Sequence, residues 1–147
     1  MGKRILLIDD DIGANEKESV PGAMAYMWYY AEALRDRGYE LTPVNSIDRA
    51  LEVLATQKFD LILLDVMMPP GNALAEADTA KGMRTGVVFA DRLAQSHPEI
   101  PVVVLTMVAN PSAFNALRNK PNVKKILQKP DYPPVFVAEE ISEIFGE

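Results

Sequence analysis

The sequence FDLILLDVMMP, residues 59–69, is the most informative stretch of this 147-residue chain. Its centre is continuously apolar, which is typical of a parallel strand covered on both faces. The run ends at Asp65, and a buried carboxylate is costly in free energy unless a site uses it. Residues 5–8 repeat this form, because they are apolar and lead directly into Asp9 and Asp10. Two such strands predict an acidic pocket at the carboxyl edge of a parallel sheet, where open α/β sheets bind ligands.

Strands and helices alternate along the whole chain. The predicted strands are residues 3–8, 39–44, 59–64, 101–106 and 123–127. The predicted helices span residues 21–37, a stretch starting at Ser46, residues 87–95, residues 112–118, and a last stretch that begins after Pro133 and Pro134 and runs to the end. This order predicts an α/β fold of the (βα)₅ type, with a five-stranded parallel sheet, right-handed crossovers and helices on both faces.

Helical periodicity predicts which side chains face the core. The expected core residues are Met24, Met27, Tyr30, Ala31 and Leu34 in the first helix, Ile47, Ala50, Leu51 and Leu54 in the second, and Val135, Ala138, Ile141, Ile144 and Phe145 in the last. The first helix also carries Tyr26, Trp28 and Tyr29. We expect neighbouring loops to shelter these rings; a partner or homodimer contact is the alternative.

Composition excludes several classes of function. A net charge of −6 argues against a nucleic-acid-binding surface, which needs clustered Lys and Arg. The chain has no apolar run near the roughly 18 residues of a membrane span, and no signal-peptide pattern. The absence of cysteine and the presence of one histidine exclude thiol nucleophiles and Cys-rich or multi-His metal sites. We therefore expect a single cytoplasmic domain over residues 1–147, with neither a nucleic acid nor a membrane as partner.

Two connections are long for a compact domain: residues 11–20 and residues 70–86. Both leave strands at the acidic edge of the predicted sheet, so both should lie over or beside the pocket. Loops of this length are usually functional or disordered, and the sequence favours neither for these two.

Four strand ends deliver polar side chains to one edge of the predicted sheet: Asp9 and Asp10, Asp65, Thr106 and Lys129. Neighbouring carboxylates repel each other, and a hard divalent cation such as Mg²⁺ relieves that repulsion with oxygen ligands. A lysine and a hydroxyl beside such an ion suit a transferring phosphoryl group. Asp65 is then the candidate nucleophile, since carboxylates form acyl phosphates. Taken singly, each residue has a structural interpretation as a cap, a turn residue or a solvated charge.

With these residues in this order, the chain resembles the receiver domain of two-component response regulators over essentially its full length. The matching motifs are the Asp9-Asp10 pair, Asp65 in DVMMP, Thr106 ending VVVLT, and Lys129 before Pro130. The resemblance implies a flavodoxin-like three-layer sandwich and phosphotransfer to Asp65 from the phosphohistidine of a sensor histidine kinase or phosphotransfer protein. It implies a downstream protein target, and no substrate turnover beyond self-phosphorylation and autodephosphorylation.

The resemblance also implies roles for individual residues. Asp10, Asp65 and the main-chain carbonyl of Met67 would bind Mg²⁺ directly, and Asp9 through water. Lys129 would pair with the phosphoryl group, and Thr106 would close onto it as the switch. The family tends to hold the peptide bond between Lys129 and the following proline in the cis form.

The chain departs from the family pattern in three places. Ile126 stands where the family often has an aromatic residue that moves with the switch threonine, and Met107 follows that threonine where a small residue is usual. The positions two beyond Asp65 and Thr106 are the apolar Met67 and Val108, which cannot orient a water molecule for attack. We therefore predict slow autodephosphorylation.

Two alternatives follow from the same residues. A haloacid-dehalogenase-like phosphatase needs an acid two residues after its nucleophile, and Met67 excludes it. A receiver-like interaction module with a non-functional or altered switch stays open, because Ile126 and Met107 favour it while the complete set of acids, threonine and lysine argues against it.

Overall fold

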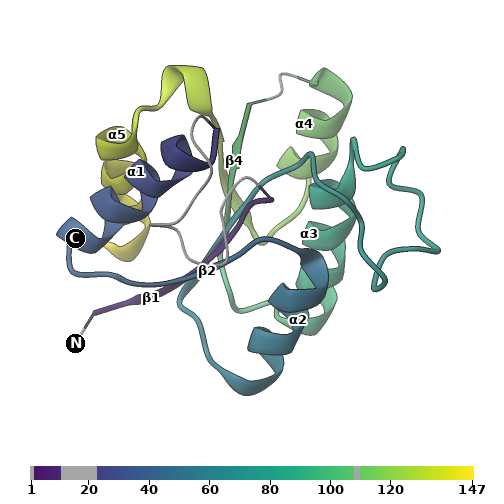
Figure 1. The fold of residues 1–147 in the computed structure, drawn as a ribbon, viewed down its shortest axis with the longest axis horizontal. Coiled ribbons are helices and arrows are strands. Elements are labelled where there is room, and N and C mark those ends of the chain that lie inside the picture. Colours follow the sequence, from purple (N-terminus) through teal and green to yellow (C-terminus); the bar gives the residue numbers. More distant parts are fainter. Residues whose placement is uncertain (1, 11–22, 108–109) are drawn as a thin grey trace.

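A five-stranded parallel sheet runs through the centre of the molecule (Figure 1). This computed structural model describes residues 2–10, 23–107 and 110–147. The strands are β1 (Arg4–Ile8), β2 (Glu40–Val44), β3 (Leu61–Leu64), β4 (Val102–Thr106) and β5 (Val123–Gln128), in the order β2-β1-β3-β4-β5. All five predicted strands are confirmed, with ends that differ by one or two residues. The chain order reverses between β1 and β3, which is the point where sheets of this kind bind ligands.

Helices cover both faces of the sheet. α1 (Ala23–Asp36) and α5 (Pro134–Phe145) pack on one face, and α2 (Ile47–Thr56), α3 (Thr85–Ser96) and α4 (Pro111–Arg118) pack on the other (Figure 1). Ser46 caps α2 as predicted, since its hydroxyl accepts the Arg49 N–H at 3.1 Å. The predicted (βα)₅ three-layer sandwich of the flavodoxin-like type is confirmed. No helix in the described ranges is long and apolar enough to cross a membrane.

Two predicted core residues lie on the surface. Leu51 of α2 is 39% exposed and Val135 of α5 is 53% exposed, whereas Val53 and Val137 are buried. Each misplaced residue lies two positions before the buried one, which is about 200° around a helix. The face of each helix that packs on the core is therefore rotated relative to the predicted face, so that it includes Val53 and Val137 and leaves out Leu51 and Val135.

The aromatic residues of α1 separate into core and surface. Tyr30 is 1% exposed and belongs to the core as predicted, together with Met27, Ala31 and Leu34. Tyr29 is 57% exposed and meets Trp28 edge to face at 5.2 Å, so the expected sheltering is wrong for this ring. The side chains of Met24 and Tyr26, and the predicted loop 11–20, lie outside the described residues.

The long connection between β3 and α3 is packed against the domain. Leu74, at its middle, is 1% exposed and joins the core beneath α2 and α3. The Asp48 carboxylate of α2 accepts the N–H groups of Asn72 and Ala73 at 2.9 and 2.8 Å, and these bonds lower the pKa of Asp48. Helix α3 begins at Thr85, two residues earlier than predicted. The connection extends outward beside α3 in Figure 1.

Candidate functional site

Three carboxylates meet at the carboxyl ends of β1 and β3. Each of Asp9, Asp10 and Asp65 offers an oxygen, and these oxygens lie within 4.8 Å of one another. The register of the sheet causes this convergence, because the Asp65 N–H donates to the Ile8 carbonyl at 3.0 Å. Asp9 and Asp65 are 1% and 6% exposed, and Asp10 is partly exposed. Three carboxylates that are so close together and so little exposed to solvent repel each other strongly when all are ionised.

A buried lysine that follows the edge strand β5 reaches the same cluster of acids. Lys129 Nζ lies 2.8 Å from Asp9 Oδ2, and both side chains are 2% exposed. Lys129 begins the short 3₁₀ turn η2 (Lys129–Asp131) that follows β5. The Tyr30 hydroxyl donates to the carbonyl of Tyr132 at 2.8 Å and lies 3.4 Å from that of Lys129, so α1 holds this turn in place. The Lys129–Pro130 peptide bond is trans, contrary to the expectation taken from the family.

The surroundings of Asp65 raise the pKa of its carboxyl to about 7. Burial is the largest cause, and the negative charge of Asp9 adds to it. Lys129, a hydrogen bond from Thr106 and the Val66 N–H at 2.8 Å lower the pKa in part. Without a further positive charge, Asp65 therefore keeps its proton up to a much higher pH than an exposed carboxyl group does.

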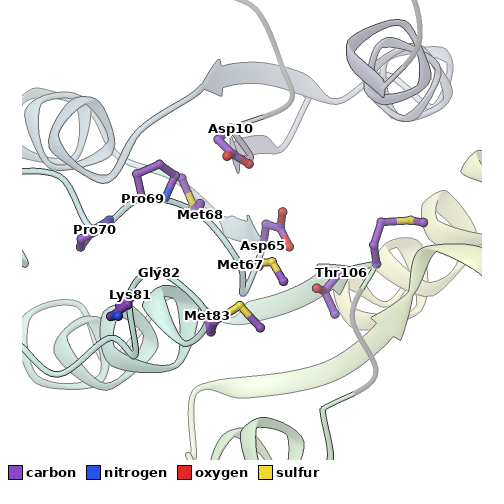
Figure 2. Close-up of a pocket in the computed structure, with 11 residues that line it drawn as sticks. Asp10, Asp65, Met67, Met68, Pro69, Pro70, Lys81, Gly82, Met83 and Thr106 are labelled. Carbon is purple, nitrogen blue, oxygen red and sulfur yellow. The ribbon is translucent and has the colours of Figure 1, made fainter.

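A pocket of about 490 Å³ opens above Asp65, a size in the range of small-ligand sites (Figure 2). Its lining joins the predicted site residues Asp10, Asp65, Met67 and Thr106 with residues of the long connection, including Lys81, Gly82 and Met83. Met107 also lines it and is 57% exposed, so this side chain lies at the mouth rather than across Asp65. Val108, the other apolar residue predicted to affect dephosphorylation, lies outside the described residues.

The donor set at this site fits Mg²⁺. Two carboxylates in contact with the pocket, Asp10 and Asp65, offer hard oxygen ligands, and Met67 belongs to the same wall. Mg²⁺ takes one or two carboxylates and keeps several waters, for which the open side of the pocket leaves room. A dication there would also lower the pKa of Asp65 again, because a positive charge favours the ionised form of the carboxyl group.

Sequence reasoning missed Gly86, which fixes the position of Asp65 from below. A Cβ atom on Gly86 would lie 2.3 Å from the Asp65 carbonyl oxygen and 2.6 Å from the Val66 Cα. The Gly86 N–H donates to the Val66 carbonyl at 2.8 Å. Helix α3 therefore starts in direct backbone contact with the end of β3. A glycine that opens a helix was the available signal in the sequence.

Comparison with known proteins agrees with this geometry. Residues 24–139 match the family model described as the response regulator receiver domain. The response regulator receiver protein CpdR of Brucella abortus (strain 2308) is 29% identical over 128 residues, which cover 87% of this chain and 85% of the relative. The range matched by the family model includes Asp65, Thr106 and Lys129. Asp9 and Asp10 precede this range, and the fold brings them to the same site.

Solved structures share the fold at low sequence identity. A CheY-like receiver domain protein from Methanospirillum hungatei JF-1 superimposes with a TM-score of 0.74 at 21% identity, covering 99% of this chain and 95% of that one. The isolated REC domain of RcsB from Salmonella enterica serovar Typhimurium, in the presence of phosphomimetic BeF₃⁻, gives a TM-score of 0.71 at 15% identity, covering 100% and 91%. With the family match over most of its length, this chain belongs to the response regulator receiver domains of two-component signalling.

Proposed function

We propose that this domain accepts a phosphoryl group on Asp65 and passes a conformational signal to a separate protein. The observation that carries the proposal is the convergence of Asp65 with two further acids, a buried lysine and a threonine at one sheet edge. Asp65 is the nucleophile in this proposal. One of its carboxylate oxygens attacks the phosphorus, and the bond from phosphorus to the donor breaks with its electron pair on the leaving atom.

The other side chains of the site stabilise the transferring group. The Lys129 ammonium neutralises charge on the phosphoryl oxygens, and the Thr106 hydroxyl donates a hydrogen bond to one of them. Asp9 holds Lys129 in place through their 2.8 Å contact. We propose Mg²⁺ as the cofactor, with Asp10, Asp65 and the carbonyl of Met67 as direct ligands and Asp9 through water. When bound, Mg²⁺ would supply positive charge to the phosphoryl oxygens and favour the ionised form of Asp65.

The proposed partners are a sensor histidine kinase or phosphotransfer protein as donor and a protein target downstream, in the cytoplasm. We further propose that residues 1–147 act as one receiver domain. The exposed Tyr29 of α1 and the exposed Val135 of α5 line a groove together with Ala33, Ala138 and charged residues, which offers one surface for a partner. Aromatic residues in such a position often dominate binding energy.

Phosphorylation is tested directly with Mg²⁺ and a small phosphodonor, followed by the intact mass of the protein. We expect a gain of one phosphoryl group that depends on Mg²⁺ and disappears in Asp65→Asn. Asp60→Asn is the matched control, because Asp60 precedes the same strand at the opposite edge of the sheet. Labelling that persists in Asp65→Asn, or that is lost equally in Asp60→Asn, would contradict the assignment of Asp65.

A second candidate function is a receiver-like interaction module whose switch is altered. The half-buried Ile126 favours it, because this residue pairs with Val104 in the sheet and offers no aromatic ring to follow Thr106. A pulldown with and without beryllofluoride separates the two functions. A working switch changes the set of captured proteins, whereas an altered module captures the same proteins in both conditions.

A further inference from the structure

Lys81 is a second lysine at the phosphorylation site, and it comes from the long connection. Among the described residues that line the pocket above Asp65, it is the only basic one. It differs from Lys129 in its setting, because Lys129 is 2% exposed and paired with Asp9 whereas Lys81 is exposed. In Figure 2, Lys81 and Met83 lie on one side of Asp65, and Asp10 lies on the other. The pocket therefore carries a basic residue on the side of Asp65 opposite to Asp10.

The backbone around Lys81 is held in an uncommon conformation. Ala80, Lys81 and Gly82 have φ angles of 53°, 58° and 90°, which form a left-handed turn. Residues with a side chain rarely adopt this conformation, because it brings Cβ too close to the following carbonyl oxygen. Strain of this kind persists only where the surroundings impose it, and it is concentrated at functional sites.

Hydrogen bonds tie this turn to the strand end that carries Asp65. The Gly82 carbonyl accepts the Met68 N–H at 3.1 Å, three residues beyond Asp65. Within the connection, the Arg84 N–H donates to the Thr79 carbonyl at 2.8 Å and closes the turn. A Cβ on Gly82 would lie 3.1 Å from the Met68 carbonyl oxygen, so the two segments are in close contact. The backbone of Lys81 is therefore held beside the end of the strand that carries Asp65.

In-line geometry gives a different role to each lysine. The attacking oxygen, the phosphorus and the leaving atom lie roughly on one line during phosphoryl transfer. Asp65 attacks from the floor of the pocket, so the leaving group points toward the mouth. Lys129 is buried with Asp9 beside Asp65 and would meet the phosphoryl oxygens, whereas Lys81 is exposed and lines the open pocket into which the leaving group points.

We propose that Lys81 binds the leaving group of anionic phosphodonors, of which acyl phosphates are the chemical class. The inference rests on the proposed phosphorylation of Asp65. When Asp65 attacks an acyl phosphate, the new bond joins its oxygen to phosphorus, and the broken bond is that between phosphorus and the acyl oxygen. The electron pair stays on that oxygen, and a carboxylate leaves without a proton. Its developing negative charge is what the Lys81 ammonium stabilises.

Donors with a phosphorus–nitrogen bond make a different demand. In phosphoramidate the nitrogen is protonated before the bond breaks, so the leaving group is neutral ammonia and develops no anionic charge. A phosphohistidine likewise leaves as a neutral imidazole when its ring is protonated. Lys81 should therefore accelerate transfer from acyl phosphates and contribute little to transfer from phosphorus–nitrogen donors.

The experiment compares two donors in matched variants. Lys81→Gln removes the cation, Lys81→Arg keeps it, and Lys58→Gln is the control, because Lys58 is exposed and precedes β3 at the opposite edge of the sheet. Initial rates of phosphorylation by acetyl phosphate and by phosphoramidate are followed by intact mass. We expect Lys81→Gln to lower the acetyl phosphate rate roughly five- to twentyfold and the phosphoramidate rate less than about twofold, a moderate effect because an exposed cation is screened.

Three outcomes would overturn the inference. If Lys81→Gln lowers the phosphorylation rate equally with both donors, Lys81 only stabilises the conformation of the connection. No loss with either donor means that it does not contact the leaving group, and failure of Lys81→Arg to retain the acetyl phosphate rate excludes a charge effect. A wild-type chain that takes a phosphoryl group from neither donor refutes the proposed function itself, and the two failures are thereby distinguished.

Discussion

Lys129 and Asp9 form a buried ion pair, with Nζ and Oδ2 2.8 Å apart and both side chains 2% exposed. The pair joins the end of β1 to the turn after β5, two segments separated by 120 residues in the chain. It lies next to Asp65, whose pKa is raised by burial and by the charge of Asp9 and lowered by the charge of Lys129. The same contact thus connects the stability of the domain with the chemistry of its candidate nucleophile.

Removing the lysine alone should destabilise the domain strongly. In Lys129→Met, Asp9 is left buried near another acid without its cation, and losing one partner of a buried pair typically costs about 3–5 kcal/mol. We expect the free energy of unfolding in urea at pH 7.5 to fall by an amount of that order. The double variant Asp9→Asn with Lys129→Met should recover most of the loss, since both charges are then gone. A double variant as unstable as Lys129→Met would show that packing, and not the uncompensated charge, decides the effect.

The raised pKa of Asp65 should make stability fall as pH rises. Between the ordinary carboxyl pKa of 3.8 and about 7, the unfolded chain loses this proton while the folded domain keeps it, so the folded state is progressively disfavoured. The contribution of Asp65 to the free energy of unfolding is fully present below pH 4 and is lost as the pH rises through 7. It amounts to at most about 4 kcal/mol.

Asp65→Asn removes this titration. With divalent cations chelated, we expect the variant to match the wild type near pH 4 and to exceed it in free energy of unfolding at pH 8. Added Mg²⁺ should narrow the difference at pH 8 by stabilising the wild type. Parallel stability curves from pH 4 to pH 8 for the two proteins would contradict the assignment of a raised pKa.

Gly86→Ala should displace Asp65 and destabilise the domain. Alanine near the start of a helix is by itself more favourable than glycine by about 1 kcal/mol. Here its Cβ would lie 2.3 Å from the Asp65 carbonyl oxygen, so the helix or the strand end must move. We expect a lower free energy of unfolding together with slower phosphorylation of Asp65. Arg92→Ala on the exposed side of α3 is the control, and a Gly86→Ala variant as stable as this control would disprove the close contact.

The acidic edge of the sheet was predictable because parallel strands end on the same side. Asp9, Asp65, Thr106 and Lys129 each follow an apolar run, and the order of the runs alone predicts that they meet. Helical periodicity also gave most of the core, and it failed for residues such as Leu51 at the margins of a face, where a small rotation of the helix decides burial.

Contacts between irregular segments were not predictable. The left-handed turn at Lys81 involves Ala80, a residue that such turns do not favour, and no periodicity places it. The support of the Lys129 turn by the Tyr30 hydroxyl depends on the exact path of the chain after β5, while the sequence showed Tyr30 only as a core residue. These positions are set by the tertiary structure.

We predict that a phosphoryl group on Asp65 is lost slowly, because Met67 on the wall of the pocket is apolar. Hydrolysis of an acyl phosphate needs a water molecule held in line with the phosphorus, and the half-buried Met67 that lines the pocket has no polar atom able to orient one. We expect a phosphoryl-Asp65 half-life of minutes or longer after donor removal, measured in Mg²⁺ from the intact mass of the protein.

Met67→Gln should shorten this half-life several-fold, because an amide can hold the attacking water. Met83→Gln places the same amide on the long connection instead of at the end of β3, and should leave the half-life unchanged. A wild-type half-life of seconds, or equal acceleration by the two substitutions, would mean that the apolar character of Met67 does not control hydrolysis.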